Sequence, residues 1–263
     1  MNFRKVLTLR WILTTMLVLA AMGVMIRLGF WQLDRLAQRK AFNARILAQV
    51  NAPTLNLAGA TSPADLTGME YRKVTVTGEY DFGQQIVLKN QYWNGQIGVH
   101  LLTPLHISGN DQAVLIDRGW VPGENPDKVQ LSQYDQVGQV EVQGVIRLSQ
   151  PKAILGLVKD PTPAPGQSQI MAWNLIEIPL IQKQMPYQLL PVYVQESPNP
   201  ASTALPYQSE LSLNITNGPH LSYAIQWFSF SAMLGLGYPF FVRRQLRRQR
   251  RNNELPQEAL RSE

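Results

Sequence analysis

The sequence predicts a membrane protein in which two transmembrane helices flank a mainly antiparallel, barrel-like β domain outside the cytoplasm, with few short helices. Three observations predict this fold class. Two long apolar runs lie near the two ends of the 263-residue chain, basic residues cluster beside each run, and apolar and polar residues alternate between them. Roughly 20 apolar residues can cross a bilayer as a helix, and alternation with a period of two is typical of β-strands.

The first apolar run covers residues 11–33 and is interrupted only by Arg27. A cleaved signal peptide is the alternative interpretation, because basic residues precede the run. However, the apolar pattern continues to Trp31 and no A-x-A cleavage site follows it. We therefore expect a cytoplasmic N-terminus (1–10) and a retained transmembrane helix (11–31). Residues at spacings of three and four over 33–50 predict that this helix continues into the domain.

The second apolar run, residues 220–242, contains no charged residue and is followed by RRQLRRQRR in the tail 243–263. A buried core helix is the alternative, but a basic cluster after an apolar run favours a transmembrane helix that ends at the cytoplasm. Both termini are then expected to be cytoplasmic, with residues 32–219 forming the β-rich domain on the other side. Since only ten residues precede the first run, we expect a multi-pass protein of the bacterial plasma (inner) membrane.

The net charge of +6 and the pI of about 9.6 raise the question of nucleic-acid binding. The charge belongs to the ends: residues 1–30 carry +4, residues 31–219 carry −2 and residues 243–263 carry +4. This placement indicates that the basic residues determine the membrane topology and are attracted to anionic lipid. No nucleic-acid partner is therefore expected. The absence of cysteine excludes a disulfide framework, thiolate-bound metal and C-x-x-C-H haem attachment.

The middle region predicts a curled or closed sheet of short strands joined by close turns. One short helix is expected at 175–184, and Pro-rich connections at 159–167 and 196–206. The predicted strands are 73–82, 85–90, 97–105, 112–121, 140–148, 170–176 and 191–196.

The predicted β domain has no catalytic constellation. The chain contains no G-x-S-x-G, no phosphate-binding glycine loop and no H-E-x-x-H. His100 and His106 form a poor metal pair, because Pro104 lies between them and a zinc site normally needs three or four ligands. Adjacent Asp117 and Arg118 favour strand-end packing and ion pairing. We therefore expect a protein that is not an enzyme.

Six blocks occur in a fixed order along the chain: LGFWQLDRLAQRK, YRKVTVTGEYD, GVHLLTPL, VLIDRGWVP, VQGVIRL and HLSYAIQWFSF. From about residue 28 to 227 they resemble the surfeit locus protein family, the cytochrome c oxidase assembly factors. The resemblance implies two transmembrane helices, a β-rich domain outside the cytoplasm and a role in placing haem a in oxidase subunit I. It also implies that His220, which heads the second apolar run, is the candidate haem ligand.

The residues around His220 fit a ligand site when they are placed on a helix. His220, Ala224, Trp227 and Ser231 share one face, and Tyr223 lies beside them. A neutral imidazole is a common axial ligand of haem iron. The alternative is that the histidine is a polar residue at the membrane surface and that the aromatic residues pack on the first helix.

Haem propionates require cations at the outer interface. Arg27, near the end of the first span, and Arg35 are the candidates, although both could contact lipid phosphate instead. On this hypothesis, Arg27→Ala weakens haem retention more than Arg39→Ala. Trp31 and Gln32 are interpreted as packing residues where the helix leaves the membrane.

Two functions compete at this point. The first is a carrier or chaperone that holds haem a transiently through His220 and assists its insertion into oxidase subunit I, with haem a synthase as an expected second partner. The second is a membrane-anchored interaction protein that stabilises nascent oxidase subunits without binding haem. The second predicts that His220→Ala still supports oxidase assembly.

Overall fold

The computed structural model describes residues 9–58, 63–123, 130–149, 169–200, 204–213 and 215–259. It contains two compact units, which we call the helix unit (Met1–Ala44 and Ile215–Glu263) and the β unit (Arg45–Asn214). The predicted Pro-rich connection at 159–167 lies outside the described residues, and so does part of the connection at 196–206.

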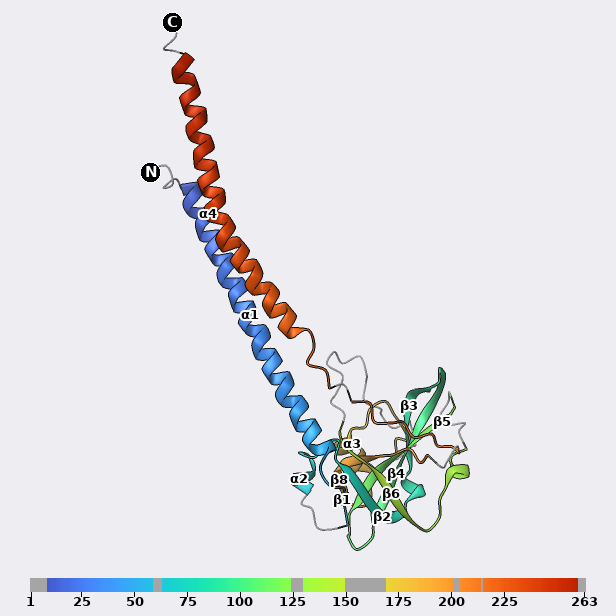
Figure 1. Cartoon of the computed structure of the whole chain (residues 1–263). Helices are drawn as coiled ribbons and strands as arrows, with labels where there is room; N and C mark the ends of the chain where they lie inside the picture. Colours follow the sequence, from blue (N-terminus) through green and yellow to red (C-terminus); the bar gives the residue numbers. More distant parts are fainter. Residues whose placement is uncertain are drawn as a thin grey trace. The chain divides into compact units, whose positions relative to one another are not determined.

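The helix unit is built from the two longest helices of the chain, α1 (Leu9–Val50) and α4 (His220–Ala259). The predicted continuation of the first helix over 33–50 is confirmed, because α1 ends only at Val50. The two helices lie side by side and antiparallel (Figure 1). Rings from the start of α1 and the later part of α4 meet at Trp11 and Phe241, with centroids 6.4 Å apart.

Small residues allow α1 and α4 to approach closely. Gly29 is buried, and a Cβ atom at this position would lie 2.6 Å from the Phe228 ring. At Gly235, a Cβ atom would lie 2.8 Å from the Met22 side chain, and buried Ser231 donates a 3.5 Å hydrogen bond to the Met22 carbonyl. The small residues Ser231 and Gly235, four positions apart on α4, therefore let the two helices approach closely.

Among the described residues, one helix is long and apolar enough to cross a membrane, and that helix is α1. Polar residues such as Gln226 and Ser229 interrupt the apolar stretch of α4. The second transmembrane helix and the cytoplasmic position of both termini therefore stay predictions.

The β unit carries eight strands among its described residues, with a few short helical segments between them (Figure 1). Six of the seven predicted strands appear within three residues of their expected bounds, and the seventh is reduced to Ala172–Trp173. The helix predicted at 175–184 is α3 (Ile178–Ile181) and the 3-10 turn that follows it. The remaining elements are α2 (Pro63–Leu66), β1 (Leu55–Asn56), β2 (Lys73–Tyr80), β3 (Ile86–Trp93), β4 (Gln96–Ile107), β5 (Ala113–Pro122), β6 (Gln139–Leu148), β7 (Ala172–Trp173) and β8 (Leu189–Glu196).

The strands close into a barrel, which settles the question that the alternation pattern left open. The sheet order β2-β6-β8-β5-β4 returns to β2 through a further β2–β4 pairing, so these five strands form a ring. Most pairs are antiparallel as predicted, but β5 and β8 run parallel in the ring, and the two-residue strands β1 and β7 also pair in parallel. Gly78 lies at the closure, where it is opposite Val140 on one side and Ile107 on the other. A Cβ atom at Gly78 would lie 2.0 Å from the His106 carbonyl oxygen, so the closure requires glycine.

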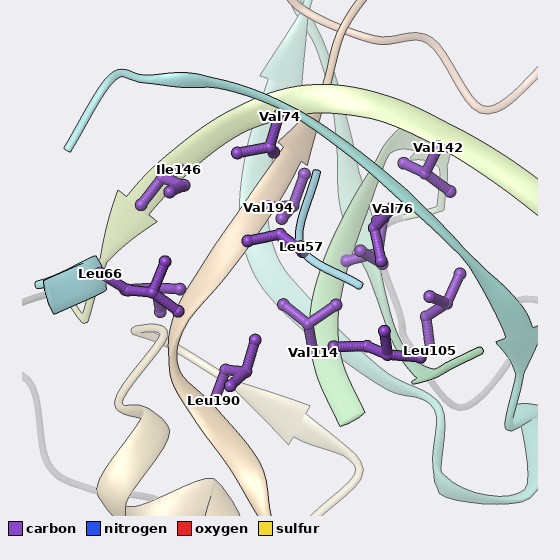
Figure 2. Packing of buried hydrophobic residues seen from close by; sticks show 13 residues of the cluster. Leu57, Leu66, Val74, Val76, Leu105, Val114, Val142, Ile146, Leu190 and Val194 are labelled. Carbon is purple, nitrogen blue, oxygen red and sulfur yellow. The ribbon is translucent and has the colours of Figure 1, made fainter. Parts of the chain in front are cut away.

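Alternating side chains fill the barrel. Val74 and Val76 of β2 point toward Leu105, Val114 and Val194 from other strands of the barrel (Figure 2). A second cluster lies against the other face of β5, with Leu115 packed among residues of α3 and β8. Strand β5 is therefore buried on both faces, which explains why VLIDRGWV contains so few polar residues.

Candidate functional site

His220 is the first residue of α4 and follows a tight turn. Gly218 has a φ of +66°, a left-handed conformation that favours glycine. Contacts from α1 hold the segment before this turn: Arg39 Nε donates to the Thr216 carbonyl at 3.0 Å, and Asn43 Nδ2 donates to the Ile215 and Thr216 carbonyls at 3.3 Å. The position of His220 is thus determined by the packing of α1 against the start of α4.

The imidazole of His220 contacts α1 directly. Its Nδ1 lies 2.8 Å from the side-chain oxygen Oε1 of Gln32. An amide oxygen can only accept a hydrogen bond, so Nδ1 is the donor. In a neutral imidazole the lone pair is then on Nε2, which is the nitrogen able to coordinate a metal.

A hollow of about 300 Å³ lies beside His220. We call it the arginine-lined hollow, because two of its five lining residues are arginines and none is acidic. Four of the five come from α1 at spacings of three and four, so they lie on one face of that helix. The lining residues are Arg35, Gln38, Arg39, Phe42 and His220.

Both arginines of the arginine-lined hollow are oriented by neighbouring groups. Arg35 donates to the Gln38 side chain at 3.1 Å, and its guanidinium lies 5.5 Å from the Trp31 ring centroid. The Arg39 guanidinium lies 5.4 Å from the Phe42 ring centroid. Because guanidinium groups recognise carboxylates and phosphates with a planar set of donors, the hollow suits a carboxylate-bearing ligand.

The structure brings His220 and Arg35 together, but it does not bring the other predicted site residues into the hollow. Arg27 is exposed on α1 and is not among the lining residues. Tyr223 is 47% exposed, and the Trp227 ring packs edge-on to Phe230 with centroids 6.3 Å apart. Tyr223 and Trp227 are also absent from the lining.

The predicted shared face of α4 serves mainly to pack against α1. Ala224 and Ser231 are buried, at 1% and 4% exposure. Packing on the first helix therefore describes Ala224 and Ser231, and His220 at the end of the face contacts Gln32. The alternative interpretation concerned the aromatic residues, and Trp227 packs on Phe230 of its own helix.

Sequence reasoning missed several residues of this site. Gln32 was interpreted as a packing residue, and Arg39 was expected to matter less than Arg27. The three- and four-residue spacing of Arg35, Arg39 and Phe42 was available as a signal. Gln32 had no signal of its own, because its partner lies 188 positions away.

The β unit holds a second group of polar side chains, in which each histidine contacts an aspartate. His100 Nδ1 lies 2.8 Å from Asp117, and His106 Nε2 lies 3.8 Å from Asp81. Within the described part of the chain, no group of three or more His, Asp or Glu residues is placed to hold a metal ion. The packing predicted for DRGW is present, and Asp117 is hydrogen-bonded to His100.

Arg118 is a buried cation at the end of the barrel, with 1% exposure. It donates to the Gln85 side chain at 3.4 Å and to the Tyr134 carbonyl, and it lies 4.8 Å from the Tyr80 ring centroid. Burial raises the pKa of the nearby Glu196 carboxyl to about 7, against the opposing charge of Arg118. Arg118 is buried and its donors bind groups of the β unit, so we assign it to stability.

Fold and site together define a class of protein: two long helices packed antiparallel, a closed β barrel between them in the sequence, and a histidine beside paired arginines where the second helix begins. The SURF1 family matches residues 19–232. The chain therefore belongs to the SURF1 family, and the predicted resemblance is confirmed.

Individual relatives agree with this assignment over most of their length. The chain is 27% identical to the SURF1-like protein of Rickettsia felis over 235 residues, which cover 88% of this chain and 97% of the relative. It is 27% identical to the SURF1-like protein of Monosiga brevicollis, with 83% of each chain covered. Surfeit locus protein 1 of Rattus norvegicus is 22% identical, with 82% of this chain and 72% of the relative covered.

Proposed function

We propose that this protein is a cytochrome c oxidase biogenesis factor of the bacterial plasma membrane. It binds haem a transiently at the outer membrane face through His220 and assists the insertion of the haem into oxidase subunit I. It is not an enzyme, and haem a synthase is the expected source of its cargo. The single observation that carries the proposal is the imidazole of His220, held through Nδ1 by Gln32 beside the arginine-lined hollow.

The surface of the helix unit supports a membrane location. Large apolar side chains of both helices remain exposed, for example Leu17 at 70% and Leu236 at 79%. An apolar surface of this kind is stable in hydrocarbon and unfavourable in water. We therefore propose that α1 and α4 both cross the bilayer, with both termini in the cytoplasm.

The donor set at His220 fits a haem. Haem iron accepts a neutral imidazole as an axial ligand, and the second nitrogen of a metal-bound histidine normally donates to a fixed acceptor. Gln32 provides that acceptor at 2.8 Å. Coordination through one histidine at an open hollow suits a cargo that must be released again.

The arginine-lined hollow supplies the positive charge that haem propionates require. Arg35 was predicted for this role, and the structure adds Arg39, which lies one helical turn further along α1. Arg27 is outside the hollow, so we now expect the reverse of the order that the sequence suggested. Arg39→Ala should weaken haem retention more than Arg27→Ala, as measured by the haem content of the purified variants at equal protein concentration.

The proposal is tested by the visible spectrum of the detergent-purified protein after co-expression with haem a synthesis. Wild type should carry haem a, and His220→Ala should lose it. His106→Ala is the matched control, because that histidine is in the β unit and pairs with Asp81. Equal haem in His220→Ala and wild type would refute His220 as the ligand and point to another haem ligand. No haem in wild type would refute haem binding and favour an interaction protein that stabilises nascent oxidase subunits.

A further inference from the structure

The contact between Gln32 and His220 determines which nitrogen of the imidazole carries the proton. Gln32 Oε1 lies 2.8 Å from Nδ1 of His220 and can only accept. The proton of a neutral imidazole is therefore held on Nδ1. Without this acceptor, the imidazole is free to carry its proton on either nitrogen.

The geometry of this contact is fixed by the helix packing around it. Gln32 is one turn of α1 beyond Gly29, where the Phe228 ring of α4 lies against the α1 backbone. On the other side, Asn43 holds the segment that leads into α4 through contacts of 3.2–3.3 Å. Gln32 therefore lies between two points at which α1 and the start of α4 are joined.

The Nε2 edge of the same imidazole faces a residue without a side chain. A Cβ atom at Gly218 would lie 3.4 Å from both Nε2 and Cδ2 of His220. A larger side chain there would contact the edge that carries the lone pair. Gly218 thus leaves more space beside Nε2 than a larger residue would, while Gln32 accepts the hydrogen bond from Nδ1.

We infer that Gln32 is a positioning residue that fixes His220 as the Nδ1–H tautomer, so that Nε2 is the nitrogen that binds haem iron. The second half of this inference rests on the proposed function. The first half concerns the protein alone. Removal of an acceptor behind a metal-bound histidine typically costs 10- to 100-fold in metal affinity.

The first experiment reads the tautomer without any haem. The chain has three histidines, so labelling with ¹⁵N-histidine gives three imidazole spectra, and the His220→Ala variant identifies the signal of His220. In wild type, His220 should show the Nδ1–H pattern. Gln32→Leu should shift it to the other tautomer or to a mixture, and Gln38→Leu, the same change within the hollow, should leave it unchanged. An unchanged His220 signal in Gln32→Leu overturns the inference, whatever the haem result.

The second experiment titrates haem a into the same purified variants and follows the absorption spectrum. Gln32→Leu should bind about 10-fold more weakly or worse, and Gln32→Glu, which keeps an acceptor, should restore binding. A more basic partner in Gln32→Glu should also lower the reduction potential of the bound haem. A changed tautomer with unchanged haem affinity would overturn the positioning role. A wild type that binds no haem would refute the proposed function, while the tautomer measurement would still decide whether Gln32 fixes His220.

Discussion

Glu196 offers a direct test of the electrostatics inside the β barrel. Its carboxyl is at the end of β8, and burial raises its pKa from the ordinary 4.5 to about 7. Arg118 lowers the pKa by its positive charge, and Asp117 raises it. Glu196→Gln replaces the ionisable group by a neutral amide of almost the same shape, so it removes the titration and keeps the packing.

The direction of the effect follows from the two pKa values. The Glu196 carboxyl binds its proton more tightly in the folded state than in the unfolded state. Its contribution to the free energy of unfolding is therefore fully present below pH 4.5 and is lost as the pH rises through about 7. Each pKa unit corresponds to about 1.4 kcal/mol. Between about pH 5.5 and pH 8.5, the loss comes to about 2 kcal/mol.

Thermal unfolding of the full chain in detergent measures this loss. The fluorescence of the buried Trp120 and Trp173 reports on the β unit. For a domain of this size, 2 kcal/mol corresponds to a change of roughly 4–8 °C in Tm. Between the two pH values, the Tm of wild type should fall by about 4–8 °C more than the Tm of Glu196→Gln. Glu141 is an exposed carboxyl on β6, so Glu141→Gln should behave like wild type.

The comparison between variants makes the reasoning refutable. Other groups titrate equally in wild type and in Glu196→Gln, so their contributions cancel in the difference. If the Tm falls by the same amount in both proteins between the two pH values, Glu196 does not titrate in this pH range. The burial argument for its raised pKa would then be wrong.

Three further predictions are tested by thermal unfolding of the full chain in detergent. Gly78→Ala should destabilise the β unit by about 3 kcal/mol or more, because its Cβ would meet a carbonyl oxygen at the barrel closure, whereas Gly68→Ala, whose Cβ has an ordinary 3.5 Å contact, should cost little. Arg118→Met should cost about 3 kcal/mol, since the buried carboxyl and acceptors near it lose their cation; a change below 1 kcal/mol would contradict this. Gly29→Leu should lower the Tm of the helix unit, because its side chain would displace the Phe228 ring; Gly23→Leu, with open space around it, should not.

Local patterns in the sequence determined much of this molecule. Alternation placed the main strands of the barrel, because every second residue of a strand meets the same core. The periodicity after Gln32 predicted that the first helix would continue, and it does so to Val50. The start of the second long helix at His220 was also expected, since the second apolar run begins there.

Other features were decided only by tertiary structure. The β2–β4 pairing joins Gly78 to Ile107, and closure depends on how the twist of all five strands accumulates. The partner of His220 and the second arginine of the hollow depend on how α1 and α4 are rotated about their axes when they pack. Sequence periodicity indicates which residues share a face of one helix. It does not say which residue of a distant helix that face will meet, because this is determined by the fit of side chains such as Phe228 against Gly29.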